Sequence, residues 1–159
     1  MTRIAEPTQH RITPELPDPL LAYLRDGTLG IILSVCEDGY PTNAFTWVIA
    51  LDSKRLRVVA DHGGRTLANL QRDRQAVIQI IGPDNLIFLV RGTTRQIKDD
   101  LEATPIGVAL FEMDVIGARD QAWPAATPAP LSFQWADDIR DEMLKMEQSV
   151  YAEMREATG

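Results

Sequence analysis

The sequence predicts a small, mainly β protein of one domain, built as an antiparallel barrel of about six strands with flanking helices. Short apolar runs alternate with turn residues over most of the chain, which is typical of antiparallel strands. The 159 residues are enough to enclose one core without disulfides or metals. Because an open sheet would leave long apolar edges, we expect these strands to close into a barrel.

Composition and charge narrow the class of function. The formal net charge of −7 disfavours a nucleic-acid partner, because such binding depends on Lys and Arg side chains that neutralise phosphates. Cys36 is the only cysteine, and His10 and His62 are the only histidines, so we expect no disulfide and no metal site. Residues 1–20 are rich in Pro and charge, and no apolar run is long enough to span a membrane. We therefore expect a cytoplasmic protein with no membrane partner.

The N-terminal part of the chain leads into the barrel through a short helix. Residues 1–16 show no hydrophobic period, and we expect an irregular arm there. Pro17 and Pro19 favour the first turn of a helix that stops at Gly27. We expect this helix to plug one end of the barrel, whose domain spans residues 17–120.

Apolar runs separated by turn residues are the expected strands. They cover residues 29–35, 40–51, 56–60, 76–81, 86–97 and 108–118. Turn signals between successive runs, such as Asp38-Gly39 and Asp84-Asn85, predict hairpins. Gly92 lies inside an apolar run and indicates a bulge or a close approach of two strands.

Residues 121–159 form a C-terminal segment outside the barrel. A linker rich in Pro and Ala over residues 123–130 precedes a helix predicted from Trp135 to Ala157. One face of this helix carries an apolar stripe, which either the chain's own barrel or a partner subunit must cover. The stripe consists of Ile139, Met143, Met146, Val150 and Met154.

The glycine loop that opens the short helix at residues 63–70 is the most informative segment for chemistry. Glycines let the backbone approach a ligand closely, and the first N–H groups of a helix attract anions. Arg65 adds a bidentate cation and Thr66 a hydroxyl, so the segment suits a phosphomonoester. The alternative is an ordinary loop and helix cap with a solvated Arg65.

Catalytic side chains are harder to find. His62 is the only plausible titrating catalyst, but it also fits a simple turn, since glycines follow it directly. No serine has the glycine pattern of a nucleophile elbow, and Cys36 has no obvious base nearby. We therefore assign no catalytic residue, and a hydrolase has little support.

The order of strands, turns and loops from about Leu20 to Arg119 resembles the pyridoxamine 5'-phosphate oxidase-like FMN-binding split-barrel superfamily. The matching segments are GTLGIILS at residues 27–34, DGYPTNA at 38–44, RTLANLQRD at 65–73 and VRGTT at 90–94. The resemblance implies a six-stranded split barrel of the FMN-binding type. The basic residues that hold a second phosphate in true pyridoxal-phosphate-forming oxidases are not recognisable in residues 131–159, so vitamin B6 oxidation is not implied.

The resemblance also implies where the cofactor binds. The second strand, at about residues 43–48, would lie along the flavin ring, and the start of the helix after the glycine loop would hold the phosphate. The implied cofactor-binding residues are Asn43, Thr46 and Trp47 at the ring and Arg65, Thr66 and Asn69 at the phosphate. Trp47 fits packing in the barrel interface as well. The site would lie at a two-fold dimer interface, to which the other subunit's Trp123 and Trp135 contribute.

We therefore expect an FMN-dependent oxidoreductase that acts as a homodimer and passes electrons or a hydride between a reduced donor and a small acceptor. Two alternatives remain. One is a non-catalytic binding or sensing protein on the same fold, holding flavin, haem, a deazaflavin or no ligand. The other is a structural dimer whose C-terminal helix recognises a partner.

Overall fold

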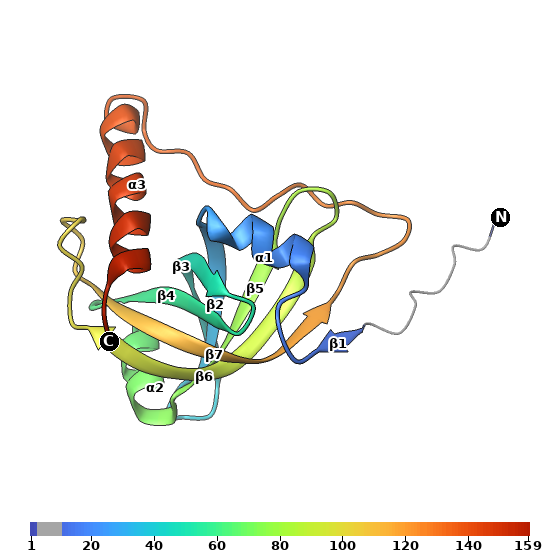
Figure 1. Cartoon of the computed structure of the whole chain (residues 1–159), viewed down its shortest axis with the longest axis horizontal. Coiled ribbons are helices and arrows are strands. Elements are labelled where there is room, and N and C mark those ends of the chain that lie inside the picture. The colour runs from blue at the N-terminus through green and yellow to red at the C-terminus, as the bar shows by residue number, and fades with distance from the viewer. Residues whose placement is uncertain (3–10) are drawn as a thin grey trace.

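The computed structural model describes residues 1–2 and 11–159; the part of the expected irregular arm at residues 3–10 lies outside the described residues. Strands and helices follow one another along the described chain as shown in Figure 1. The strands are β1 (Ile12–Thr13), β2 (Thr28–Val35), β3 (Pro41–Asp52), β4 (Arg55–Asp61), β5 (Gln75–Ile81), β6 (Ile87–Lys98) and β7 (Val108–Asp120). The helices are α1 (Asp18–Arg25), α2 (Arg65–Asp73) and α3 (Arg140–Glu156). In this described part, no helix is long and apolar enough to cross a membrane.

Strands β2 to β7 close into an antiparallel barrel. The order around the barrel is β7-β4-β3-β2-β5-β6, and β6 pairs with β7 to complete the ring. The predicted fold class, a six-stranded antiparallel barrel with flanking helices and a C-terminal helix, is confirmed.

The short β1 lies within the stretch expected as an irregular arm, residues 1–16, and it pairs with the barrel. Its Ile12 and Thr13 lie opposite Arg119 and Ala118 of β7. On this edge, the pairing of β7 with β4 runs only from Val108 to Asp114. Strand β4 therefore leaves the C-terminal end of β7 unpaired on this edge, and β1 pairs with it there.

Turn and cap residues place the elements close to their predicted positions. Pro17 is the N-cap of α1, and Gly27 follows the helix with a φ of +83°, a left-handed value that favours glycine. In the hairpin between β5 and β6, Asp84 and Asn85 have φ values of +56° and +60°. Asp and Asn tolerate this conformation better than most residues, which explains why the turn forms here.

Gly92 marks a close approach between β6 and β7, as predicted. A Cβ atom at this position would lie 2.1 Å from the backbone oxygen of Asp114. The register of the pair also shifts between Arg91 and Gly92, as in a β-bulge. Glycine is therefore required for the two strands to meet in this way.

The barrel interior holds the main hydrophobic core. Leu20 and Leu24 of α1 are completely buried in it, and Leu70 of α2 contributes from another segment of the chain. The prediction that the first helix plugs the barrel agrees with this packing. Both helices thus remove the apolar barrel interior from water.

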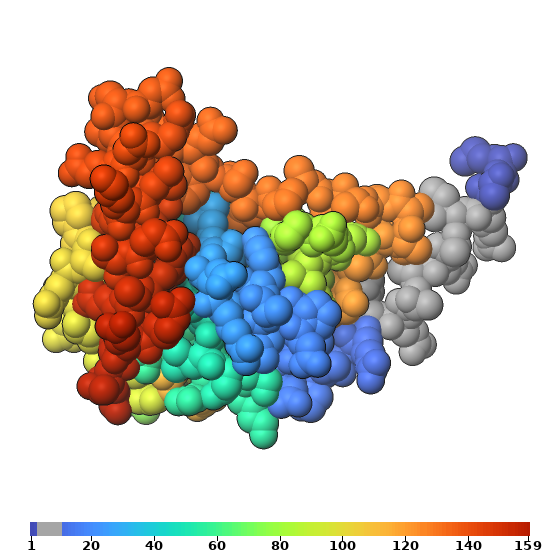
Figure 2. Space-filling model, turned by 45° about the horizontal axis from the view of Figure 1, so that its top comes forward, coloured from blue at the N-terminus to red at the C-terminus, as the bar shows by residue number. Residues whose placement is uncertain are grey.

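Helix α3 packs on the outside of the barrel against β3 and β4 (Figure 1). Its C-terminal half buries Val150, Tyr151 and Met154 in a second apolar cluster. Its first turns project beyond the barrel (Figure 2), where Leu144 is 47% exposed, and the N-cap residue Ile139 is 40% exposed. The chain's own barrel therefore covers only the C-terminal half of the predicted stripe.

Helix α3 begins at Arg140, later than the predicted start at Trp135. Residues 137–139 form a turn, and the ring of Trp135 packs edge-to-face on Phe133 with centroids 4.9 Å apart. Helical periodicity alone does not reveal this contact. The aromatic side chains hold the segment against the barrel, and the helix starts only after it.

Candidate functional site

The site begins where β3 and β4 diverge. Strand β3 pairs with β2 along Pro41 to Val48, but its pairing with β4 starts only at Val48. At the point of divergence the hydroxyl of Thr46 donates to the backbone oxygen of Val59 (2.8 Å) and accepts from its N–H (3.0 Å). Among the described strands, the stretch Pro41–Trp47 is therefore paired on one edge alone, and its other edge is open.

An apolar pocket of about 380 Å³ lies at this divergence. Its walls come from β2, β3, β4, the start of β7, the loop before β7 and the C-terminal linker. The lining residues are Leu29, Phe45, Thr46, Trp47, Val59, Asp61, Ile106, Val108, Phe133 and Trp135. Among these described residues Asp61 is the sole ionisable group. The pocket therefore suits a largely apolar ligand, and its aromatic side chains suit a flat ring.

The first turn of α2 adjoins this pocket through Asp61. Gly64 is the N-cap of α2, and Asp61 Oδ1 lies 2.6 Å from the position that a Cβ of Gly64 would take. The following Arg65 is exposed and forms no ion pair with any described side chain, whereas Thr66 is 2% exposed. The free N–H groups of this turn and the guanidinium of Arg65 can attract an anion, and the carboxylate of Asp61 opposes it.

Asn69 holds α2 on the barrel. Its amide nitrogen donates to Ser34 Oγ at 3.0 Å and to Cys36 Sγ at 3.6 Å. Its amide oxygen accepts from Arg72, which also donates to the backbone oxygen of Val35. Asn69 is thus buried in a network of α2 and the end of β2, and this network fixes where Arg65 and Thr66 stand. A cavity of about 520 Å³ runs along this face of α2.

Of the three residues predicted at the ring, Trp47 and Thr46 line the apolar pocket and Asn43 does not. Trp47 lines the apolar pocket and also packs beneath α3, where its Nε1 donates to Glu147 at 3.3 Å. Thr46 lines the pocket too, with its hydroxyl bonded to β4. Asn43 is exposed opposite Leu33 of β2, and it does not line the apolar pocket among the described residues. Both interpretations of Trp47, ring contact and packing, are compatible with this geometry.

The two tryptophans of the linker differ in position. Trp135 lines the apolar pocket of its own chain, whereas the resemblance implied a contribution across a dimer interface. Trp123 is 52% exposed, and its backbone oxygen accepts from Asn85 in the hairpin between β5 and β6. Trp123 therefore lies outside the lining of this pocket.

Seven lining residues were not named as site residues from the sequence: Leu29, Phe45, Val59, Asp61, Ile106, Val108 and Phe133. Phe45 is 69% exposed on β3, and alternation along the strand places it on the same face as Trp47. That alternation could have revealed it. Asp61 and Phe133 carry no comparable signal, because long-range packing brings them to the pocket.

His62 acts as a turn residue in this structure. Its Nε2 lies 2.9 Å from the backbone oxygen of Asp99 and 2.9 Å from Asp100 Oδ1. Its backbone N–H donates to Gly107. These bonds attach the end of β4 to the loop before β7, which supports the interpretation of His62 as a turn residue.

Several solved structures share this architecture. A protein from Lactobacillus delbrueckii named for pyridoxamine 5'-phosphate oxidase is 17% identical with a TM-score of 0.55, over 67% of this chain and 94% of that one. An F420 reductase is 18% identical with a TM-score of 0.57, over 67% of this chain and 100% of that one. HupZ of Group A Streptococcus is 13% identical with a TM-score of 0.55, over 70% of this chain and 99% of that one. This chain has the split-barrel fold of the pyridoxamine 5'-phosphate oxidase-like proteins.

The resemblance seen in the sequence is confirmed at the level of the fold. No protein-family model and no curated protein matches the sequence. At these identities the similarity of the split barrels establishes the architecture alone. The function has to be argued from the pocket and the first turn of α2.

Proposed function

We propose that this split barrel is an FMN-binding flavoprotein, with the flavin ring in the apolar pocket along β3 and the phosphate at the first turn of α2. One observation carries the proposal: the pocket lies at the open edge of β3 and adjoins the start of α2 through Asp61. A flat apolar site next to an anion site matches a molecule with a ring at one end and a phosphate at the other.

The residues divide the work between the two ends of the ligand. Phe45, Trp47 and Val59 supply apolar contact for the ring, and the open edge of β3 supplies backbone groups. Arg65 and Thr66 hold the phosphate, and Asn69 positions them by fixing α2. When bound, FMN supplies the electron or hydride transfer, and the protein orients it and excludes water.

The proposed activity is that of an oxidoreductase working between a reduced donor and a small acceptor, as a homodimer.

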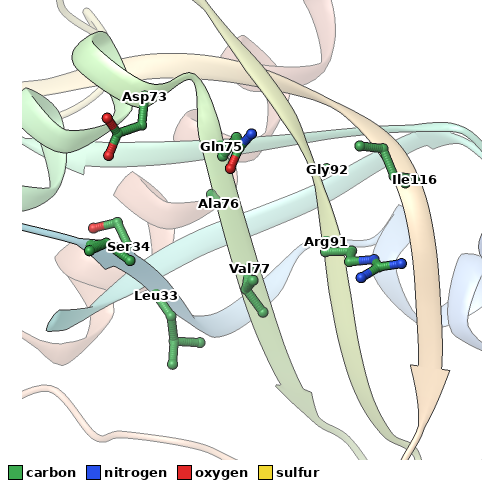
Figure 3. A pocket seen from close by; sticks show the side chains of 10 residues that line it. Leu33, Ser34, Asp73, Gln75, Ala76, Val77, Arg91, Gly92 and Ile116 are labelled. Atoms are coloured by element: carbon green, nitrogen blue, oxygen red, sulfur yellow. The ribbon is translucent and has the colours of Figure 1, made fainter. Parts of the chain in front are cut away.

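A second surface supports the dimer. A hollow of about 480 Å³ lies across β2, β5, β6 and β7. Leu33, Val77 and Arg91 are among the side chains that line it (Figure 3). Ile116 beside it is 54% exposed, and such an apolar patch is typical of a partner interface. Sedimentation of wild type and Ile116→Asp tests this dimer interface. A variant with the same mass in solution as the wild type contradicts it.

A non-catalytic binding role is the second candidate, and the linker supports it. Phe133 and Trp135 line the pocket from the C-terminal segment, so part of the ring would be covered. A covered ring is less accessible to a nicotinamide donor. One structural neighbour is an F420 reductase, which keeps a deazaflavin among the possible ligands.

An absorbance experiment distinguishes these roles. Purified protein is incubated with FMN, passed through gel filtration and scanned in the near-ultraviolet and visible range before and after addition of NADH or NADPH. Flavin bands that co-elute with the protein and bleach with a donor support the oxidoreductase. Bands that persist support a binding role for FMN, and protein without flavin bands contradicts the proposal that this chain binds FMN.

A further inference from the structure

The segment around Phe133 and Trp135 closes one side of the apolar pocket. Its backbone is attached to the barrel at Leu131, whose N–H donates to Ile81 at 2.8 Å, whereas the bond from the Ile139 N–H to Ala136 closes only a local turn. Residues 132–135 are neither helix nor strand. The segment is therefore held against the barrel mainly by its aromatic side chains.

The indole nitrogen of Trp135 lacks an acceptor. Trp135 Nε1 is buried and has no hydrogen-bond partner among the described residues. The comparable nitrogen of Trp47 does have one, since it donates to Glu147. Because a buried N–H without an acceptor destabilises a protein, such groups are uncommon and indicate a missing partner.

The position of the indole limits where this partner can be. Trp135 forms a wall of the apolar pocket and of a second hollow of about 390 Å³. In the second hollow the carboxylate of Glu147 accepts from Trp47, and the indole of Trp135 forms no bond with it. In the apolar pocket none of the described lining residues, Thr46 and Asp61 included, accepts from the indole, so a ligand can supply the acceptor.

We propose that Trp135 is a specificity residue of its own chain's pocket and donates through Nε1–H to a carbonyl oxygen or ring nitrogen of a planar heteroaromatic ligand. Asp61, the ionisable group of the lining, favours a ring that also carries an N–H group and disfavours an anionic ring. The ligand class is thus a flat ring with both an acceptor and a donor on its edge. The inference rests on the proposed function, because the flavin ring belongs to this class.

The test follows the indole N–H signals of the ¹⁵N-labelled protein by NMR while riboflavin, which has the ring without the phosphate, is added. Substitution of Trp47, Trp123 and Trp135 by Phe assigns the signals. We expect the Trp135 signal to move downfield on saturation, as a new hydrogen bond requires, while the Trp123 signal stays in place. Once the signals are assigned, the titration uses the wild-type protein alone, so its result does not depend on the stability of any variant.

The affinities of the variants complete the test. Trp135→Phe keeps an aromatic ring and removes the N–H, so riboflavin binding should weaken by about tenfold, the factor that one good hydrogen bond provides. Trp123→Phe is the matched control and should bind like the wild type. A Trp135 signal that does not move, or no riboflavin binding at all, overturns the inference. If FMN still binds in the first of these cases, the proposed function stands without it.

Discussion

Arg57 of β4 and Glu112 of β7 form an ion pair in the seam between the barrel and α3. Arg57 Nη2 lies 2.9 Å from Glu112 Oε2, and the two side chains are 6% and 2% exposed. The same guanidinium donates to the backbone oxygens of Met154 and Ala157 at the end of α3. Because a cation stabilises the C-terminus of a helix, this pair fixes α3 to the outer face of the barrel.

Replacing Arg57 by Met should lower the free energy of unfolding by about 3 kcal/mol, because Glu112 would keep only the more exposed Arg95 as its close partner and α3 would lose its C-terminal donor. Urea denaturation measures the change. The double variant Arg57→Met/Glu112→Leu removes both charges and should recover part of the loss. A single variant as stable as the wild type would show that the pair does not hold α3 in place.

Glu153 should make the stability depend on pH. Burial by itself raises the pKa of Glu153, but hydrogen bonds from Lys98 and from the backbone N–H groups of Glu102 and Ala103 outweigh it and lower the pKa below 4.5. The folded state then binds the proton less tightly than the unfolded state. This contribution is present above the unfolded pKa and is lost as the pH falls through the folded pKa.

We therefore expect the free energy of unfolding to decrease as the pH falls through and below the ordinary Glu value of 4.5, and Glu153→Gln to reduce that decrease. Chemical denaturation at several pH values measures both. Glu156→Gln, at an exposed position of the same helix, is the control. Identical pH profiles for Glu153→Gln and the wild type would count against this role.

Gly92→Ala should destabilise the protein by about 2–4 kcal/mol, because the new Cβ would collide with the backbone of Asp114 and force β6 and β7 apart. Gly63→Ala is the matched control, since a Cβ there meets only Asp61 Oδ2 at 3.7 Å, an ordinary contact. Thermal unfolding compares the two. Equal midpoints would contradict the close approach of the strands.

Asp61→Asn should tighten FMN binding by about threefold at low ionic strength, because it removes a negative charge next to the first turn of α2 and keeps the shape of the side chain, including an oxygen that accepts from a ring N–H. Flavin fluorescence measures the affinity. The gain should shrink as salt is added, since salt screens the repulsion. A variant with weaker or unchanged affinity would place the phosphate away from Asp61.

Local patterns in the sequence, together with the family resemblance, predicted most of the fold. Alternation gave the strands of the barrel, Asp84 and Asn85 marked a turn, and Gly92 marked a close approach. These features depend on residues near one another in the chain. The start of α3 was wrong because Trp135 packs on Phe133 and the barrel instead of joining the helix.

The candidate site was less accessible to such reasoning. The sequence indicated Arg65 and Thr66 through the glycine loop, and these do lie at the first turn of α2. The apolar pocket, in contrast, depends on the point where β3 leaves β4, which the hydroxyl of Thr46 marks. Which strand edge loses its partner is a property of the closed barrel, so Asp61 could be assigned to the pocket only from the structure.

The most direct test of the central claim is a titration of FMN against wild type, Arg65→Ala and Arg25→Ala, followed by flavin fluorescence. Arg25 is exposed in the last turn of α1 and serves as the control for loss of an arginine. We expect saturable binding to wild type and Arg25→Ala, with about tenfold weaker binding to Arg65→Ala. A wild-type protein that does not bind FMN, or three proteins with the same affinity, would contradict the claim.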